Sequence, residues 1–157
     1  MTETITFERL SPTLPPQVET IAKRTKKVAI IALYALENSG VRHITSILKH
    51  HGWQADLIFF KQWYNNRVPN PTEEEVQLLC DKVIEGGYDV IGLSFGSPYW
   101  LIARELTQRL RAVCPDSLML WGGLHVTLSP ETCIPYADVL CVGEGECPMI
   151  ELMERLE

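Results

Sequence analysis

Short apolar runs alternate with amphipathic stretches along most of the chain. Residues 27–33 form a continuous, β-branched apolar run, which is typical of a parallel strand covered on both faces. Comparable runs at 54–60, 89–94, 118–121 and 138–142 predict further strands. The spacing between these runs is long enough for a helix to connect each strand to the next.

Apolar residues at helical spacing fill the first three of these connections. Three buried stripes identify the helices: Val41, Ile44, Ile47 and Leu48; Val76, Leu79, Cys80 and Val83; and Ala103, Leu106, Leu110 and Val113. Gly52 is predicted to stop the first helix. Thr72 and Glu75 form a capping box at the start of the second, and Gly86 and Gly87 end it. A short helix is predicted at Ser129 and Pro130, and a last helix from near Pro148.

Strands that alternate with helices predict an α/β fold, a doubly wound five-stranded parallel sheet of Rossmann-like or flavodoxin-like type. The expected strand order is 2-1-3-4-5. Residues 1–25 are polar and contain Pro12, Pro15 and Pro16, so we expect an extended lead-in there and the folded domain at 26–157. Ligands on such sheets bind at the carboxyl ends of the strands, which selects four loops: 34–40, 96–100, 122–127 and 143–146.

The composition excludes several classes of protein. Hydrophobic residues make up 46% and charged residues 22% of the 157 residues, which is the balance of a globular domain with a real core. The net charge of −6 argues against a nucleic-acid partner. No apolar stretch approaches the roughly 18–20 residues that span a bilayer, and the N-terminus has no signal-peptide core, so a cytoplasmic location is expected. The odd cysteine count predicts free thiols.

The loops do not match those of the common protein classes that have this fold. A phospho-receiver domain needs acidic residues where this chain has Tyr34, Ala35 and Ser94. A dinucleotide site needs a glycine-rich turn after the first strand, but only Gly40 is present there. The chain has no C-x-x-C, H-x-x-x-H or G-x-S-x-G pattern, so no metal-ligating or catalytic residue is predicted.

Two motifs at the ligand edge are more specific. Residues 121–127 read W-G-G-L-H-V-T and residues 143–146 read G-E-G-E, with Pro130, Glu131 and Asp138 between them. In this order they resemble the signature region of the cobalamin (B12) binding domain that precedes the catalytic domain of B12-dependent radical SAM enzymes. The resemblance extends from about Lys26 to the C-terminus. It implies cobalamin as cofactor, together with a C-terminal radical SAM domain of the same parent protein, S-adenosylmethionine and a [4Fe-4S] cluster.

The resemblance also implies how cobalt is bound. Better-known B12 proteins carry D-x-H-x-x-G after the first strand, and its histidine replaces the benzimidazole on cobalt. If Gly40 is the final glycine, Ala35 takes the Asp place and Glu37 takes the His place. We therefore expect base-off cobalamin without a histidine ligand. The lower face of the cobalt would be covered by Tyr34, Leu36 or Glu37, or would be open to water. Asn38 is a further cofactor-binding residue expected in the same loop.

The other loop residues have two interpretations each. Gly122 and Gly123 suit a slot for the nucleotide tail, where Ser94 would hydrogen-bond the benzimidazole, or they simply turn the chain. We expect His125 to line the site together with Thr127 of the same motif, and the alternative is that His125 bonds the backbone and holds the loop. Gly96 and Ser97 are expected in the cofactor-binding loop after the third strand. In the same loop, Tyr99 and Trp100 pack on the corrin edge or cover the first turn of the next helix. The carboxylates and backbone of Gly143, Glu144, Gly145 and Glu146 meet corrin amides or cap the last helix.

A radical SAM domain itself is missing from the sequence. Its C-x-x-x-C-x-x-C motif does not occur, and Cys133, Cys141 and Cys147 have spacings of 8 and 6, so buried thiols are expected. The interpretation is an excised N-terminal cofactor module that performs no chemistry alone, supporting methyl transfer or related radical chemistry. A freestanding corrinoid carrier and a degenerate scaffold domain remain as alternatives. Trp63 and Tyr64 are candidates for the surface that packs against a partner domain.

Overall fold

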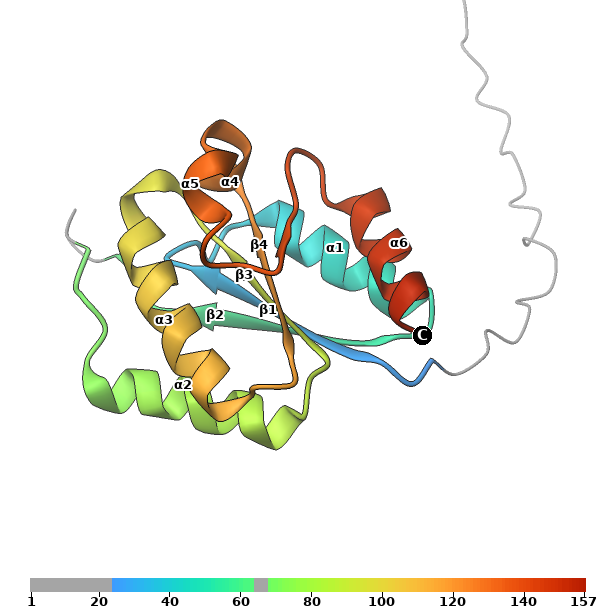
Figure 1. The fold of residues 1–157 in the computed structure, drawn as a ribbon, viewed down its shortest axis with the longest axis horizontal. Coiled ribbons are helices and arrows are strands. Elements are labelled where there is room, and N and C mark those ends of the chain that lie inside the picture. Colours follow the sequence, from blue (N-terminus) through green and yellow to red (C-terminus); the bar gives the residue numbers. More distant parts are fainter. Residues whose placement is uncertain (1–23, 64–67) are drawn as a thin grey trace, which may run out of the picture.

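The computed structural model describes residues 24–63 and 68–157. The predicted lead-in falls almost wholly outside the described residues, as does Tyr64. Within the described part of the chain, five parallel strands form one sheet in the order β2-β1-β3-β4-β5, which confirms the predicted fold class and strand order (Figure 1). The strands are β1 (Lys27–Leu33), β2 (Gln54–Phe60), β3 (Val90–Ser94), β4 (Leu118–Gly122) and β5 (Val139–Leu140).

Helices cover both faces of this sheet. They are α1 (Ser39–His50), α2 (Glu73–Gly86), α3 (Trp100–Val113), α4 (Leu124–Leu128), α5 (Pro130–Cys133) and α6 (Glu146–Leu156), with a 3-10 turn, η1 (Ser97–Tyr99), before α3. In Figure 1, α2 and α3 lie on one face, and α1 and α6 lie together on the other. The short helices α4 and α5 follow β4 at the carboxyl edge of the sheet.

The caps predicted for α2 are present. Thr72 Oγ1 accepts a hydrogen bond from the Glu75 N–H at 3.3 Å, and Glu75 Oε2 accepts one from the Thr72 N–H at 2.7 Å. Gly87 ends the helix with a φ of 59°, a conformation that glycine adopts without steric cost. Helix α1 is capped by Asn38, whose Oδ1 accepts from the Val41 N–H at 3.2 Å.

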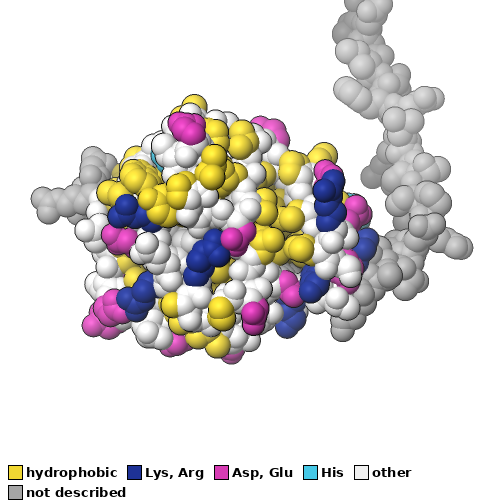
Figure 2. Space-filling view, viewed as in Figure 1, with side chains coloured by type: hydrophobic (Ala, Val, Ile, Leu, Met, Phe, Trp, Pro, Cys, Tyr) yellow, Lys and Arg dark blue, Asp and Glu magenta, His cyan; other side chains and the backbone are white. Residues whose placement is uncertain are grey.

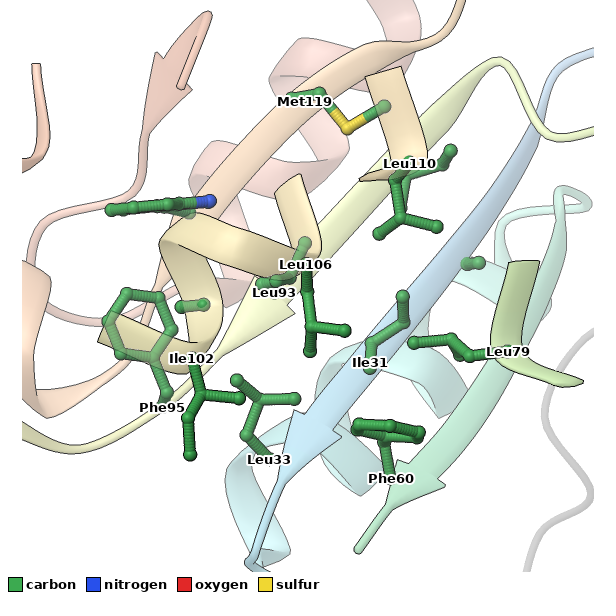
Figure 3. Close-up of a cluster of buried hydrophobic side chains, with 14 of the residues drawn as sticks. Ile31, Leu33, Phe60, Leu79, Leu93, Phe95, Ile102, Leu106, Leu110 and Met119 are labelled. Atoms are coloured by element: carbon green, nitrogen blue, oxygen red, sulfur yellow. The ribbon is translucent and has the colours of Figure 1, made fainter. Parts of the chain in front are cut away.

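Alternation of side chains along the strands separates two apolar cores. Ile31 and Leu33 of β1 and Met119 of β4 pack under α2 and α3, in the larger cluster (Figure 3). Ile30 and Leu120, one position away, face α1 and α6 instead. The strand register sets Ile30 beside Gly92, and Gly92 beside Leu120, so these three residues form one row across the sheet.

The chain after β4 departs from the prediction. Residues 124–127 were expected in a loop, but they belong to helix α4. Gly123 has a φ of 96°, which reverses the chain at the strand end and lets a helix start at once. Helix α5 begins at Pro130 as predicted, although the Ser129 side chain makes no capping hydrogen bond.

Smaller details differ from the predictions, in the start of the last helix, the length of β5 and the burial of two side chains. Helix α6 begins at Glu146, before Pro148, because a proline is tolerated in the first turn, where N–H groups have no intrahelical partner. Strand β5 is restricted to two residues. Val113 is 39% exposed at the end of α3, and Cys147 is exposed rather than buried.

Candidate functional site

A cavity of about 250 Å³ lies between the sheet and the helices α1 and α6. Its floor is the row Ile30, Gly92 and Leu120, and it extends to Ser94 and Gly122 at the carboxyl ends of β3 and β4. The remaining lining residues are Asn38, Gly40, Val41, Ile44, Leu93, Gly123, Leu124, Cys141, Gly143, Gly145 and Met149. Their side chains are largely apolar, so the cavity favours an apolar, flat group over a charged one.

The glycines of this cavity have different physical roles. A Cβ built on Gly92 or Gly122 would meet its nearest heavy atom at 3.5 Å or 3.6 Å, which is ordinary van der Waals contact. Alanine therefore fits at both positions, and its methyl group would occupy space that is now open. A Cβ on Gly123 would lie 2.8 Å from the backbone N and O of Phe95, so the close approach of two backbones requires glycine there.

Few polar side chains reach the cavity. Ser94 Oγ makes no hydrogen bond to any protein group within residues 24–63 and 68–157, so it is available to a ligand. Asn38 Oδ1 is engaged at the start of α1. Burial, together with the nearby Glu146 carboxylate, raises the pKa of the Cys141 thiol, which therefore stays neutral.

Thr127 joins the two motif loops. Its hydroxyl donates to the Gly123 carbonyl at 3.1 Å and accepts from the Gly143 N–H at 3.0 Å. Gly143 has a φ of 81°, a conformation that favours glycine. The last residue of G-G-x-H-x-T thus holds the first residue of G-E-G-E, although Thr127 itself does not line the cavity.

His125 connects the segments at the carboxyl edge of the sheet by hydrogen bonds and does not line the cavity. It is only 7% exposed, its Nδ1 lies 3.1 Å from Ser97 Oγ, and its Nε2 lies 3.3 Å from Thr132 Oγ1. The Thr132 hydroxyl donates to the Ser129 carbonyl, so neutral His125 has its proton on Nε2 and accepts from Ser97 on Nδ1. The ring also stacks on Trp100 at 6.0 Å between centroids. These contacts fit the loop-holding alternative, with side chains rather than backbone as the partners, and not the site-lining role that the sequence suggested.

The aromatic residues of the loops after β1 and β3 pack on the opposite face of the sheet. Tyr34 is 3% exposed, stacks on Tyr99 with 4.6 Å between ring centroids, and donates from its hydroxyl to the Pro69 carbonyl at 2.6 Å. Burial raises the pKa of Tyr34 to about 12. Tyr34, Tyr99 and Trp100 belong to the core under α2 and α3.

The acidic residues lie at the rim. Glu146 Oε1 is 3.3 Å from His43 Nδ1, which links the start of α6 to α1 beside the cavity. Among residues 24–63 and 68–157, no side chain makes a capping hydrogen bond at the N-terminus of α6, and Glu144 is exposed. Glu37 is also exposed, and the Leu36 carbonyl accepts a hydrogen bond from Arg42.

The structure brings part of the predicted set together. On the cavity wall are Asn38, Gly40, Ser94, Gly122, Gly123, Gly143 and Gly145. Away from it are Tyr34, Leu36, Glu37, Gly96, Ser97, Tyr99, Trp100, His125, Thr127, Glu144 and Glu146. Sequence reasoning missed Ile30, Val41, Ile44, Gly92, Leu93, Leu120, Leu124, Cys141 and Met149. A glycine inside an apolar strand, such as Gly92, is the one available signal, because it marks a close approach to a backbone.

Apolar side chains also gather on the surface next to the cavity. Figure 2 shows apolar side chains over α4 and α5, and the large exposed apolar residues there are Leu124, Leu128 and Ile134. Trp63 is likewise 51% exposed. Within the described ranges, no cluster of three or more His, Cys, Asp or Glu side chains suits a metal ion, and no helix is long and apolar enough to cross a membrane.

A doubly wound sheet with a glycine-floored cavity at its carboxyl edge defines a ligand-binding α/β domain. The family model of the B12 binding domain matches residues 25–153. The chain therefore belongs to the B12 binding domain family, and this membership supports cobalamin binding. A search of curated proteins found no match to the sequence.

Solved structures with the same fold include cobalamin proteins and others. A cobalamin-binding protein from Desulfitobacterium hafniense DCB-2 has a TM-score of 0.65 at 19% identity, over 85% of this chain and 60% of that one. The cobalamin-dependent S-adenosylmethionine radical enzyme OxsB has a TM-score of 0.61 at 18% sequence identity, and the match covers 83% of this chain and 18% of the OxsB chain. A CheY-like protein from Pseudomonas aeruginosa PAO1 has a TM-score of 0.59 at 13% sequence identity, and the match covers 83% of this chain and 100% of the CheY-like chain. At such identities the likeness shows the fold alone.

Proposed function

We propose that this chain binds cobalamin base-off, with the benzimidazole tail in the cavity and no histidine on cobalt, as the cofactor module of a B12-dependent radical SAM enzyme. The observation that carries the proposal is the cavity itself, with open space at Gly92 and Gly122 and a Ser94 hydroxyl that has no hydrogen-bond partner among the described residues. When bound, cobalamin supplies a cobalt centre for methyl transfer or related radical chemistry with the partner domain.

The dimensions of the cavity fit a nucleotide base and not a corrin ring. Sites that enclose a whole drug-sized ligand have about 300–1,000 Å³, and this cavity has about 250 Å³. A flat aromatic base can lie against glycine backbone, because no Cβ stands between them. The Ser94 hydroxyl can donate to the free ring nitrogen of a benzimidazole. The corrin would then remain outside, along the carboxyl edge of the sheet.

The positions of the four histidines support a cobalt centre without a histidine ligand. His125 is buried with both ring nitrogens hydrogen-bonded. His50 and His51 are at the end of α1, which is the opposite edge of the sheet from the cavity mouth. His43 is exposed on α1 and pairs with Glu146.

The radical SAM parent is supported by the paired loop motifs and by the exposed edge. Leu124 and Leu128 are one helical turn apart and are 63% and 66% exposed. Such apolar surface beside a cofactor site favours a covering domain. The full gene tests this: a C-x-x-x-C-x-x-C motif encoded after this chain supports the proposal, and a gene without one favours a freestanding corrinoid carrier.

Cobalamin binding is tested by titrating the protein with hydroxocobalamin, followed by absorbance and gel filtration. We expect a base-off spectrum and co-elution, and a reduced cob(II)alamin sample whose EPR spectrum lacks splitting from an axial nitrogen. The His43→Ala variant should give the same spectrum. A histidine-ligated spectrum, or no binding at micromolar concentrations, would overturn the assignment.

The place of the tail is tested by Gly92→Ala. The added methyl group has room in the fold but enters the cavity. We expect the variant to keep its thermal stability and its affinity for cobinamide, which has no nucleotide tail, while its affinity for cobalamin falls at least tenfold. Unchanged cobalamin affinity would contradict tail insertion.

A further inference from the structure

We propose that the cavity selects among cobamides by the base of the nucleotide tail, accepting benzimidazoles and rejecting purines. This inference rests on the proposed function, in which the tail enters the cavity. It concerns the chemistry of the walls, which offer an aromatic base very few hydrogen-bonding partners.

The described residues around the inner part of the cavity have apolar side chains. Ile30 and Leu120 flank the bare backbone of Gly92 on the sheet, and Val41 and Met149 close the cavity from α1 and α6. The backbone at Gly92 pairs with β1 on one side and β4 on the other, so its N–H and C=O groups are engaged in the hydrogen bonds of the sheet. A base that enters this space exchanges water for aliphatic side chains.

Among the described residues that line the cavity, Ser94 and Asn38 have polar oxygen or nitrogen groups in their side chains. The Asn38 oxygen already accepts from the Val41 N–H, so Asn38 has only its amide N–H groups to offer, at the start of α1. The Ser94 hydroxyl has no protein partner in the described part of the chain and can donate one hydrogen bond. The Cys141 thiol, kept neutral by burial, is a weak partner.

These few hydrogen-bonding groups suit a benzimidazole base and not an adenine base. A benzimidazole joined to its ribose keeps one free ring nitrogen, an acceptor that Ser94 satisfies, and its remaining edge is hydrocarbon. Adenine keeps three ring nitrogens and an exocyclic amine that needs an acceptor. Each polar group buried without a partner lowers affinity by roughly tenfold, so an adenine tail is disfavoured by its desolvation.

Three corrinoids separate this inference from the function on which it rests. Dissociation constants of the whole chain are measured for cobalamin, for the adeninyl cobamide and for cobinamide. We expect cobalamin to bind at least tenfold more tightly than the adeninyl cobamide, which binds no more tightly than cobinamide. Equal affinity for cobalamin and cobinamide would overturn tail insertion itself. Equal affinity for the two tailed cobamides, both above cobinamide, would overturn only the selection of the base.

A variant with a polar wall provides the converse test. Ile44 is a half-buried cavity residue of α1, and Ile47 is half-buried on the same helix but outside the lining. Ile44→Asn adds a donor and an acceptor to the cavity wall, and Ile47→Asn is the matched control. We expect Ile44→Asn to shift the ratio of the two affinities toward the adeninyl cobamide several-fold, and Ile47→Asn to leave the ratio unchanged. The same ratio in both variants would contradict the inference, and circular dichroism verifies that both fold.

Discussion

Replacement of Gly123 by alanine should destabilise the domain far more than the same change at Gly122, one residue earlier. Gly123 has φ 96° and ψ −171°, a region that only glycine populates, and forcing another residue into it costs about 1–3 kcal/mol. The new Cβ would also lie 2.8 Å from two backbone atoms of Phe95, and such overpacking typically costs about 1–3 kcal/mol more. The expected loss of unfolding free energy is therefore about 2–6 kcal/mol, a large fraction of the roughly 5–15 kcal/mol of an ordinary domain.

Gly122→Ala is the matched control, because its Cβ meets nothing closer than 3.6 Å and its φ is not in the left-handed region. We expect its unfolding free energy to stay within about 1 kcal/mol of the parent. Urea denaturation of the ligand-free protein, followed by tryptophan fluorescence, measures both variants, and Trp121 reports from the same strand. Equal stability of the two variants, within about 0.5 kcal/mol, would refute the argument from backbone geometry.

Three further predictions concern the edge and the pH dependence of stability. Thr127→Val should lower the unfolding free energy by about 1 kcal/mol and accelerate hydrogen exchange at the Gly143 amide, since its hydroxyl partner is lost; unchanged exchange would argue against the bridge. His125→Phe should destabilise the fold by about 1–3 kcal/mol, while the spectrum of bound cobalamin stays the same; a changed spectrum would give His125 a role at cobalt. Partial burial raises the pKa of Asp138, but hydrogen bonds from Arg111 and from the Met119 backbone outweigh it and lower this pKa below its ordinary value of 3.8. The stabilising contribution of the Asp138 carboxylate is therefore present above pH 3.8 and is lost as the pH falls through the lowered pKa. Urea midpoints measured from pH 6 to about pH 3 should therefore fall less for Asp138→Asn than for the parent, and parallel curves would contradict this.

The sequence predicts the fold well because the fold depends on periodicity. The apolar run of β1 and the capping box at Thr72 are local signals, and the order of the strands follows from the right-handed winding of parallel units. Helix α4 was missed since its start depends on the conformation of Gly123, and G-G-x-H-x-T has no apolar periodicity that distinguishes a short helix from a loop.

The cavity was only partly predictable, for a different reason. Val41 and Ile44 were identified as the buried face of a helix, and the same apolar pattern serves both a packed core and the wall of a cavity. Conversely, Tyr34 follows β1 at the ligand edge, but its φ of 55° takes the side chain to the other face, where it stacks on Tyr99. Position at an edge is readable from topology, whereas the face to which a loop side chain turns depends on tertiary packing.

The hydrogen bonds of Thr127 have a consequence for protein engineering. Because one hydroxyl connects the turn after β4 to the turn after β5, the two loops form a single module from segments 16 residues apart in sequence. Transfer of the first loop alone into another doubly wound domain would leave the hydroxyl without its backbone donor and the second loop without its anchor. A graft of this cofactor edge therefore has to include both turns, with Thr127 and Gly143 moved as a pair.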